Sequence, residues 1–422
     1  MRVLFLTTEF PWPATSGGPV RTLSQLEMLA ALPEIERIVL LSVSERPVSA
    51  AQCEALAEAV PKLAVRAPVF HPIHLWRSPL RVPRVLALRL LGVPYLAAKW
   101  DSPPLRESIR NELRDPALDV VYVDHLGMAR YLPDIRGARP SLPVVLDQHN
   151  VESEFFRQFA ESGSGLARQI ARAEWRASAR FEKRALQSVD AVVCISRADA
   201  DVFERLARVR AHVVPVVMEP ERGNHPPPGR LHFCYVGSLR WRPNVAGLDW
   251  FCQEVWARIR ARLPEATMEI AGVDLATDAN GCLVVPDAWK VPGVETVGFL
   301  EDLEPLHRRS LAMLAPVLGG SGVRIKVLEG FRAGLPIVTT PDGASGLALT
   351  DGVEALIADD ADGFCERVDR LARDEDLRAR LRHEGAAYLE QHHSPAVAQR
   401  ALRAALGEKF LSLRERPDGG VK

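Results

Sequence analysis

Two series of short apolar runs, separated by a proline-rich stretch, constrain the fold of this chain most. In the first half such runs alternate with helical patterns, notably 20–32 and 165–187, and the runs read RVLFLTT, RIVLLSV, DVVYVD, LPVVLD and DAVVCIS. Residues 216–230 then carry four prolines and two glycines, which is typical of a linker. The second series reads LHFCYVGS, ATMEIAG, VETVGFL, LAMLAPV, LPIVTT and EALIAD. Alternating strands and helices form parallel sheets, so we expect two doubly wound α/β domains.

The predicted domains are residues 1–218 and 219–422. A chain of 422 residues exceeds one ordinary core, which supports two domains. The last helical pattern, about 394–414, is expected to pack back on the first domain. In doubly wound folds ligands bind beyond the carboxyl ends of the strands, so we expect the site in a cleft between the domains.

Composition excludes several classes of protein. The net charge of −1 argues against nucleic-acid binding, which needs a basic face. The six cysteines form no C-x-x-C pair, so we expect neither zinc nor disulfides and infer a reducing compartment. The N-terminal apolar run turns polar at Thr7 and is too short for a signal peptide, and no segment is long enough to span a membrane. We therefore predict a cytoplasmic protein, with peripheral contact at the membrane inner face as a further hypothesis.

The stretch GGSGVRIKVLEGFRAGLPIVTT, residues 319–340, predicts an anion site. A helix beginning near Val323 would point its free N–H groups at the glycine turn. Arg324 would lie on the first turn, and cations are unfavourable at a helix N-terminus unless an anion is bound there. Two cations therefore indicate a diphosphate, and Glu329, one turn later, could accept hydrogen bonds from ribose. The alternative is that Lys326 and Glu329 form an ordinary surface pair.

This stretch resembles the donor-sugar signature of retaining GT-B glycosyltransferases of family four. In many members two glutamates are separated by seven residues; Glu329 matches the second, the ribose ligand, and Ser321 stands at the first. The sequence is closer to a branch reading G-G-[GS]-[GT]-x-R-x-K-x-L-E among exopolysaccharide-associated sugar transferases. The resemblance implies a GT-B fold whose donor-binding residues here include Ser321, Gly322, Val323 and Glu329. Arg324 and Lys326 would stabilise the departing diphosphate in place of a divalent metal.

A second resemblance lies in CYVGSLRWRPNVAGLDWF, residues 234–251. The family's loop carries an arginine after the glycine and a lysine six residues later, both on the diphosphate. After Gly237, these two positions hold Ser238 and Asn244 in this chain. Binding of the diphosphate is therefore expected to depend more on Arg324 and Lys326. Phe299, in VGFLED, matches the loop that reads the nucleobase edge. The tryptophans are expected to be core aromatics: Trp241, Trp250 and Trp256.

The first half offers an acceptor side. Gly17 and Gly18 in PWPATSGGPVR could let a ligand approach the backbone, although a plain strand–helix turn would also explain them. His149 follows a buried strand, where a lone histidine is commonly structural. Its place matches the family's histidine near the reacting sugar, so we interpret it as catalytic. Asp124 and His125 are weaker candidates for the same rim.

Two D-x-D pairs raise the alternative of a metal-dependent enzyme: Asp199 with Asp201, and Asp360 with Asp362. Asp199 follows Ser196 in an S-x-x-D capping pattern, and the other pair also opens a helical stretch. We interpret both pairs as helix caps and predict no catalytic metal and no cofactor.

The predicted reaction moves a sugar from a nucleoside diphosphate sugar to a hydroxyl acceptor, which could be a glycan, a lipid-linked molecule or a small molecule. Two alternatives stay open: a nucleotide-sugar epimerase of the same fold, or an inactive GT-B partner subunit. The inactive partner subunit stays open because Ser321 replaces the first glutamate, and because Ser238 and Asn244 replace the arginine and lysine of the loop.

Two basic stretches of the first half suggest a membrane surface. Arginines recur every four residues within 165–187, and others lie among leucines within 76–100: Arg168, Arg172, Arg176, Arg180 and Arg184, then Arg77, Arg81, Arg84 and Arg89. Cations beside apolar residues are attracted to anionic bilayers. The alternative is a solvated helix face on which Glu174 and Glu182 neutralise the arginines.

Overall fold

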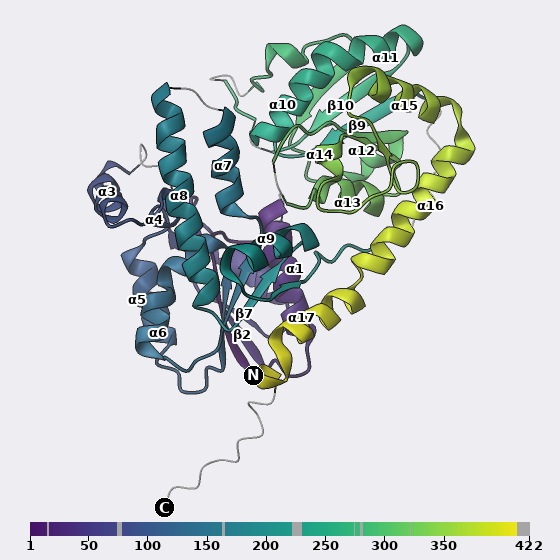
Figure 1. Cartoon of the computed structure of the whole chain (residues 1–422). Helices are drawn as coiled ribbons and strands as arrows, with labels where there is room; N and C mark the ends of the chain where they lie inside the picture. Colours follow the sequence, from purple (N-terminus) through teal and green to yellow (C-terminus); the bar gives the residue numbers. More distant parts are fainter. Residues whose placement is uncertain are drawn as a thin grey trace, which may run out of the picture. The chain divides into compact units, whose positions relative to one another are not determined.

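The computed structural model describes residues 1–14, 17–73, 78–162, 165–221, 230–273, 275–278, 282–320 and 322–411 (Figure 1). The chain divides into two compact units. The first contains residues 1–14 and 18–216 together with the chain from Ala398 onward, and the second is built mainly of Val217–Val397. The division after Val216 falls in the proline-rich stretch, close to the predicted boundary after residue 218.

The first unit is built on a parallel sheet with the strand order β3-β2-β1-β5-β6-β7-β8, in which β4 also pairs with β2. Strand β1 lies inside the sheet, with Leu4 opposite Val39 of β2 and Val121 of β5. All five strands predicted in this half are present. The strands β3, β4 and β8 were not predicted, because runs of two or three residues show no periodicity. The bounds are β1 Arg2–Thr7, β2 Arg37–Ser44, β3 Leu63–Val65, β4 Val69–Phe70, β5 Val120–Asp124, β6 Val144–Gln148, β7 Ala191–Cys194 and β8 Ala211–Val213.

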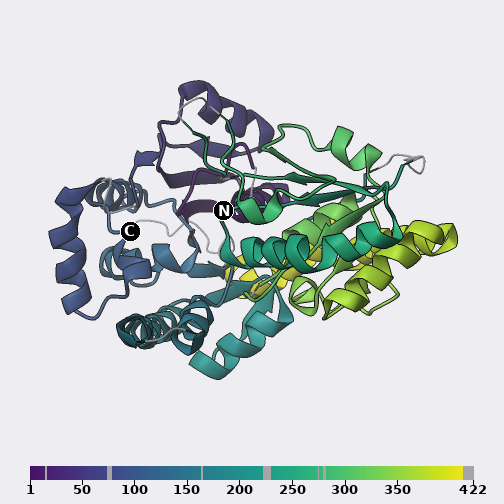
Figure 2. The ribbon, with the colours of Figure 1, turned by 90° about the horizontal axis from the view of Figure 1, so that it is seen from above.

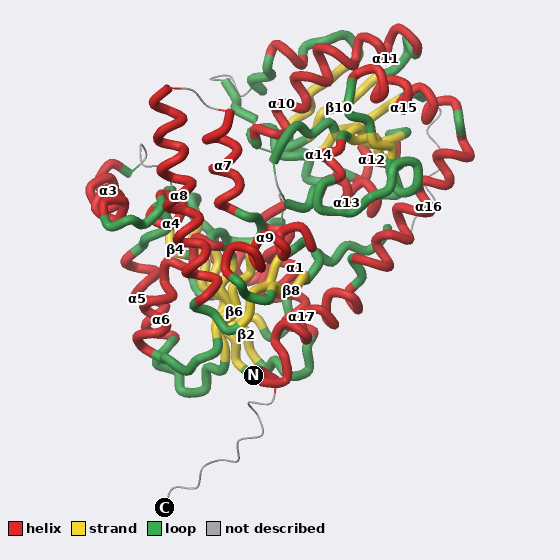
Figure 3. Tube along the Cα trace, in the orientation of Figure 1, coloured by secondary structure: helices red, strands yellow, loops and turns green. Residues whose placement is uncertain are grey.

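Helices cover both faces of this sheet (Figure 3). Figure 2 shows α7 and α8 nearly end-on and side by side. Among the described residues, no helix is both long and apolar enough to cross a bilayer. The helices are α1 Gly17–Ala31, α2 Ala50–Ala59, α3 Val82–Leu90, α4 Tyr95–Ala98, α5 Pro103–Glu112, α6 Leu132–Ala138, α7 Glu152–Ser162, α8 Gly165–Gln187 and α9 Arg197–Ala207, with the C-terminal α17 Pro395–Leu411. Helix α17 is interrupted at Gly407, which has a φ of 66°.

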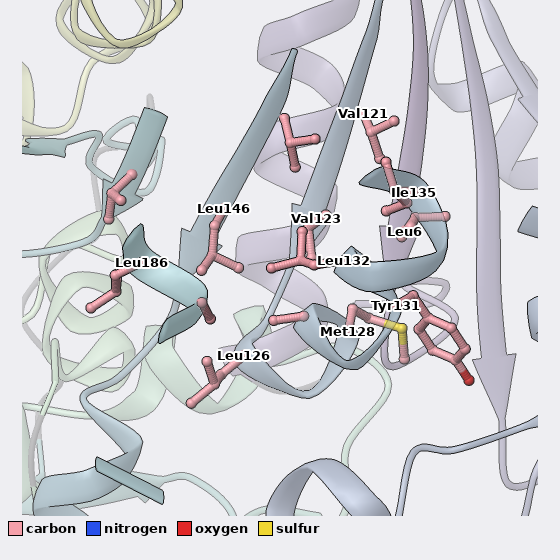
Figure 4. Close-up of a cluster of buried hydrophobic side chains, with 14 of the residues drawn as sticks. Leu6, Val121, Val123, Leu126, Met128, Tyr131, Leu132, Ile135, Leu146 and Leu186 are labelled. Atoms are coloured by element: carbon pink, nitrogen blue, oxygen red, sulfur yellow. The ribbon is translucent and has the colours of Figure 1, made fainter. Parts of the chain in front are cut away.

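The core of the first unit shows how the sheet is held (Figure 4). Alternate residues of neighbouring strands, such as Leu6, Val123 and Leu146, are fully buried on one face. A 3₁₀ turn, Leu126–Tyr131, and α6 cover that face. Burying one such side chain contributes about 1.5–3 kcal/mol, so these layers fix the strand ends that carry the polar residues of the site.

The second unit contains a parallel sheet of order β11-β10-β9-β12-β13-β14. Its strands are β9 His232–Val236, β10 Thr267–Ala271, β11 Val294–Gly298, β12 Ala312–Ala315, β13 Ile337–Thr339 and β14 Leu356–Ile357. The helices are α10 Arg242–Trp250, α11 Trp256–Arg262, α12 Glu304–Arg309, α13 Ile325–Arg332, α14 Pro341–Ala344, α15 Ala361–Arg373 and α16 Glu375–His392.

The central strand β9 explains why both faces of the second sheet are covered. Phe233 and Tyr235 belong to a core shared with α11 and α15, whereas Cys234 belongs to a core shared with α13. Successive side chains of a strand point to opposite faces, so a strand with no polar face requires helices on both sides. The chain therefore contains two doubly wound α/β units, as predicted.

Candidate functional site

In the second unit, the carboxyl end of β9 meets the start of α13 around Lys326. Nζ of Lys326 donates hydrogen bonds to Oη of Tyr235 and Oδ1 of Asn244, each at 2.6 Å. The Asn244 amide donates in turn to the backbone carbonyl of Ser238 at 2.8 Å. A Cβ on Gly237 would lie 3.0 Å from Nζ and 3.1 Å from the tyrosine hydroxyl, so a larger residue would push the ammonium away. Lys326 is thus fixed against the turn between β9 and α10.

The ammonium of Lys326 is held by neutral oxygens. Burial, and secondly the positive charge of Arg324, keep the pKa of Lys326 well below its ordinary range. Within the described part of the chain, no carboxylate forms an ion pair with it. Glu329 pairs instead with Arg332, through bonds of 3.0 and 2.5 Å. The alternative of a Lys326–Glu329 surface pair is therefore wrong. An anion placed beside Lys326 would favour the charged form of the lysine.

Arg324 lies at the N-cap of α13 and not on its first turn, because the helix begins at Ile325 and not near Val323 as predicted. The backbone of Arg324 has a φ of −86° and a ψ of 86°, and the preceding Gly322 has a φ of 84°. Neither conformation continues a helix. The glycine therefore delays the start of α13, and Gly322 lies outside the helix that carries Lys326.

The guanidinium of Arg324 is bound to backbone carbonyls. The side chain is buried and donates to the carbonyl oxygens of Gly319, Gly320 and Asp342 at 2.9 to 3.1 Å. It also lies over the ring of Trp241, 5.1 Å from the ring centre. Trp241 is thus part of the site and not a core aromatic as expected. Arg324 therefore stabilises the shape of the glycine turn. The sequence had predicted a direct contact between Arg324 and the diphosphate, and not this role.

The remaining donor-side candidates lie around this turn. Gly319, Gly320 and Gly322 all have positive φ, which fits a turn that only glycine adopts easily. Ser321 lies outside the described residues. Val323 is half-buried next to the turn. Phe299 follows β11 and is 50% exposed, so its ring is available to stack on a planar group.

In the first unit, Asp124 connects the carboxyl ends of β1, β5 and β6 with helix α1. Its Oδ1 lies 2.6 Å from Nε2 of His149, and its Oδ2 accepts hydrogen bonds of 2.7 Å from the hydroxyls of Thr7 and Thr22. Burial alone would raise the pKa of Asp124, but the charges of His149 and His125 outweigh burial and keep it below its ordinary range. The weaker sequence candidate thus proves to be the residue that orients His149.

His125 is the second histidine beside this carboxylate. Its ring centre is 3.6 Å from that of His149, and its backbone φ is 71°, which is unusual outside glycine. Burial opposes protonation, but the carboxylates of Asp124 and Glu9 raise the pKa of His125 to about 9. His125 therefore carries a positive charge at neutral pH.

Glu9 explains one of the two predicted glycines. A Cβ on Gly18 would lie 2.2 Å from Oε1 of Glu9, so the carboxylate rests directly on the glycine at the start of α1. Gly17 begins the same helix. Carboxylates are favoured at a helix N-terminus, which accounts for this placement. Glu9 was not predicted, because nothing in its local sequence distinguishes it from a loop residue.

A cavity of about 460 Å³ in the first unit adjoins these groups. Its walls mix acids, bases and aromatic surface, including Glu9, Glu45, His125, Glu152, Lys99 and Trp100. Desolvation lowers the pKa of Lys99, although Glu152 and Glu45 oppose that shift. Carboxylates and cations beside an aromatic ring can bind hydroxyl groups while an apolar face stacks on the ring.

In each D-x-D pair the first aspartate belongs to a helix cap, whereas Asp201 and Asp362 pair with arginines. Ser196 caps α9 by accepting from the backbone N–H of Asp199, whose carboxylate accepts from the serine hydroxyl. Asp360 caps α15 by accepting from the N–H of Gly363. Asp124, His125 and His149 have ligand-type atoms within 4.8 Å of one another, but hydrogen bonds within the first unit already account for both oxygens of Asp124.

Two family descriptions match this chain. "Glycosyltransferase Family 4" matches residues 50–222, and "Glycosyl transferases group 1" matches residues 230–374. The chain belongs to glycosyltransferase family four. This family-four protein is 21% identical over 380 residues to an "Uncharacterized 44.6 kDa protein in cps region" of Klebsiella pneumoniae. The matched residues make up 87% of this chain and 90% of that protein.

Solved structures share the fold over nearly the whole chain. Sucrose-phosphate synthase of Thermosynechococcus elongatus matches with a TM-score of 0.64 and 12% identity, covering 95% of this chain and 97% of that one. HepE of Anabaena, described in complex with UDP and glucose, matches with a TM-score of 0.60 and 13% identity over 96% and 99%. Trehalose-6-phosphate synthase OtsA matches with a TM-score of 0.64 and 13% identity over 97% and 99%. The protein is a nucleotide-sugar glycosyltransferase of GT-B fold.

Proposed function

We propose that this enzyme transfers a hexosyl group from a nucleoside diphosphate sugar to a hydroxyl of a glycan, with retention of configuration and without a metal. The observation that carries the proposal is the position of Lys326. Its ammonium contacts Asn244, the position where the wider family carries a lysine on the diphosphate. The positive charge that this turn lacks is therefore supplied from α13.

The chemistry of the donor side follows from that position. Charge develops on the departing diphosphate, and a fixed cation in a partly desolvated site stabilises it more than water would. Arg324 keeps the glycine turn in the shape that admits the phosphates. Glu329, one turn further along α13, is assigned to the ribose hydroxyls, with Ser238 and Gly237 lining the strand end. Phe299 is assigned to the base.

The acceptor side is assigned to the first unit. Asp124 orients His149, which would contact the sugar or the acceptor hydroxyl. The cavity beside His125 offers Glu9, Glu152 and Trp100 to a polyhydroxylated ligand. HepE is described with UDP-glucose and TarM of S. aureus with fondaparinux, and the Klebsiella relative is named for the cps region. These descriptions support a glycan acceptor in polysaccharide biosynthesis.

A catalytic metal is not required by this proposal. Asp199 and Asp360 belong to helix caps, and Asp201 and Asp362 each pair with an arginine. Lys326, in its charged form beside the bound diphosphate, would supply the positive charge of the donor side. The proposal also includes peripheral contact with the inner face of a membrane, where a lipid-linked acceptor would be found.

The test uses the purified protein, a panel of nucleotide sugars and EDTA. We expect slow hydrolysis of one donor, insensitivity to EDTA, and transfer with retention when a glycan is added. Lys326→Met should lower kcat about 10²–10³-fold, with a smaller change in the donor KM, because the charge peaks in the transition state. Lys290→Met, at an exposed lysine paired with Asp287, is the matched control.

Three results would contradict the proposal. Formation of an epimer would support the epimerase, and binding without turnover of any donor would support an inactive partner subunit. Activity lost with EDTA and restored by Mn²⁺ would overturn the metal-free mechanism.

A further inference from the structure

Two charged side chains line the cavity of the first unit without an ionic partner. Nζ of Lys99 lies over the ring of Trp100, 5.1 Å from the ring centre. Among the described residues, neither this ammonium nor the carboxylate of Glu152 forms a hydrogen bond or an ion pair, because the hydrogen bonds of both residues come from their backbones. Desolvation lowers the pKa of Lys99, and the charge of Glu152 is near enough to oppose that shift. Opposite charges therefore face one cavity without closing on each other.

Lys99 lies on a segment that polar contacts anchor. The arginines of 76–100 that the structure describes all bind inward: Arg81 to the carbonyl of Lys99, Arg84 to Asp101 and Arg89 to Glu174. Arg77 lies outside the described residues. Glu174 also accepts hydrogen bonds from the first two N–H groups of α4, at 2.6 and 3.4 Å, and the hydroxyl of Tyr131 donates to the carbonyl of Trp100 at 2.7 Å. The backbone that carries Lys99 is therefore fixed, and this stretch is not the basic surface that the sequence predicted.

Glu152 is anchored in a similar way, at the first residue of α7. Its backbone N–H and that of Ser153 donate to the carboxyl oxygens of Glu182 at 3.1 and 3.3 Å, and the hydroxyl of Ser153 donates to the same group at 2.5 Å. A carboxylate in the first turn of a helix is stabilised by the helix dipole, so Glu152 does not need Lys99 as a counter-ion.

Helix α8 supplies both anchors, through Glu174 and Glu182. It lies beside α4 and α7 (Figure 1). Glu174 binds α4 and pairs with Arg89, and Glu182 binds the start of α7, so among the described residues neither glutamate pairs with an arginine of α8. The alternative of a helix face that these glutamates neutralise is therefore wrong. Their contacts instead hold Lys99 and Glu152 in place on the cavity wall.

A hydroxyl group is what this pair of charges can bind together. It accepts a hydrogen bond from an ammonium and donates one to a carboxylate, whereas a carboxylate only accepts and an ammonium only donates. The other charges of the cavity act against charged ligands, because like charges brought together are costly. The carboxylate of Glu45, which accepts from the N–H of Ile73, disfavours an acidic group, and the protonated His125 disfavours an amino group.

We infer that Lys99 and Glu152 together select a neutral sugar in this cavity, by donating to and accepting from its hydroxyl groups. An acidic sugar would place its carboxylate against Glu152, and an amino sugar would place its ammonium against Lys99. Sites made of buried polar groups discriminate strongly, because a wrong ligand leaves those groups unpaired. That this sugar is the acceptor of the transfer rests on the proposed function, but its binding in the cavity does not.

Ligand-observed NMR titration of the full chain tests the selection. The neutral probes are the methyl glycosides of glucose, galactose and mannose, and the charged probes are those of glucuronate and glucosamine. We expect wild type to bind a neutral glycoside about tenfold more tightly than either charged one, the scale of one hydrogen bond to a charged group. Lys99→Met should weaken neutral binding about tenfold and remove the discrimination against glucosamine only. Glu152→Gln should weaken neutral binding to a similar extent and remove the discrimination against glucuronate only.

Lys290→Met and Glu161→Gln, at exposed residues that form ion pairs, are the matched controls and should keep the wild-type preference. Wild type that binds no neutral glycoside, or binds a charged one as tightly, would overturn the inference. A variant that loses the discrimination against both charged glycosides would also overturn it, because its residue would then only maintain the shape of the cavity. Donor hydrolysis by wild type is measured on the same samples. Hydrolysis without a preference for neutral glycosides removes only this inference, and that preference without hydrolysis of any donor removes only the proposed function.

Discussion

In the second unit a lysine is held by a tyrosine hydroxyl and an amide, and an arginine by backbone carbonyls. In the first unit a buried aspartate holds two histidines and two threonine hydroxyls. In the first arrangement no carboxylate among the described residues pairs with Lys326, so a bound anion is what would favour its charged form. The second already pairs its carboxylate with a protonated His125, which suits a neutral hydroxyl group that needs orientation more than charge.

The largest effect should come from removing the carboxylate of the first unit. Asp124→Ala leaves His149 and the hydroxyls of Thr7 and Thr22 without their buried acceptor, so we expect a loss of about 3–5 kcal/mol in the free energy of unfolding of that unit. Chemical denaturation measures it, and Asp360→Ala, which removes only an exposed cap, should cost about 1 kcal/mol. Equal losses in the two variants would show that Asp124 is an ordinary hydrogen-bond partner.

A smaller effect is expected on donor affinity. Glu329→Ala should weaken nucleotide binding by about 1.5–3 kcal/mol, the scale of a hydrogen bond to a charged group, without unfolding the protein. Calorimetry with a nucleoside diphosphate measures it. Glu221→Ala is the matched control, because Glu221 shares Arg332 with Glu329. If both variants bind equally weakly, the effect comes through Arg332 and not through ribose.

The smallest predicted effect is a pH dependence of stability. The folded pKa of His125, about 9, lies above the unfolded value of about 6.5, so its contribution is complete below pH 6.5 and is lost as pH rises toward 9. A shift of this size corresponds to about 3 kcal/mol, and because the ring is partly exposed to solvent we expect the first unit to lose about 1–2 kcal/mol over that window. His125→Gln should remove the slope, and an unchanged slope would contradict the charge assignment.

The sequence predicted what local periodicity encodes. The range 165–187 coincides with α8, and the eleven predicted strands are present, because apolar runs and helical spacing are local signals. The orientation of side chains on a short helix is not local. Nothing in VPRVLALRL indicates that Val85 is the buried residue of α3. The exposure of Leu86 and Leu90 was therefore not predicted.

The site was predicted in part for the same reason. Lys326 and His149 could be singled out from their motifs, but their partners are distant in sequence: Tyr235 is 91 residues from Lys326, and Asp124 is 25 from His149. Arg324 was assigned to the ligand because a helix start cannot be located within two residues from sequence alone. Its carbonyl partners depend on the shape of the glycine turn.

Proton uptake on nucleotide binding tests the central claim, that Lys326 supplies the charge for the diphosphate. Because burial and Arg324 depress the pKa of free Lys326, a bound diphosphate should raise it, and binding should take up a proton at pH values between the two. Titration calorimetry in buffers of different ionisation enthalpy measures this uptake. The account predicts measurable proton uptake for wild type and close to none for Lys326→Met; equal uptake by the two proteins would contradict it.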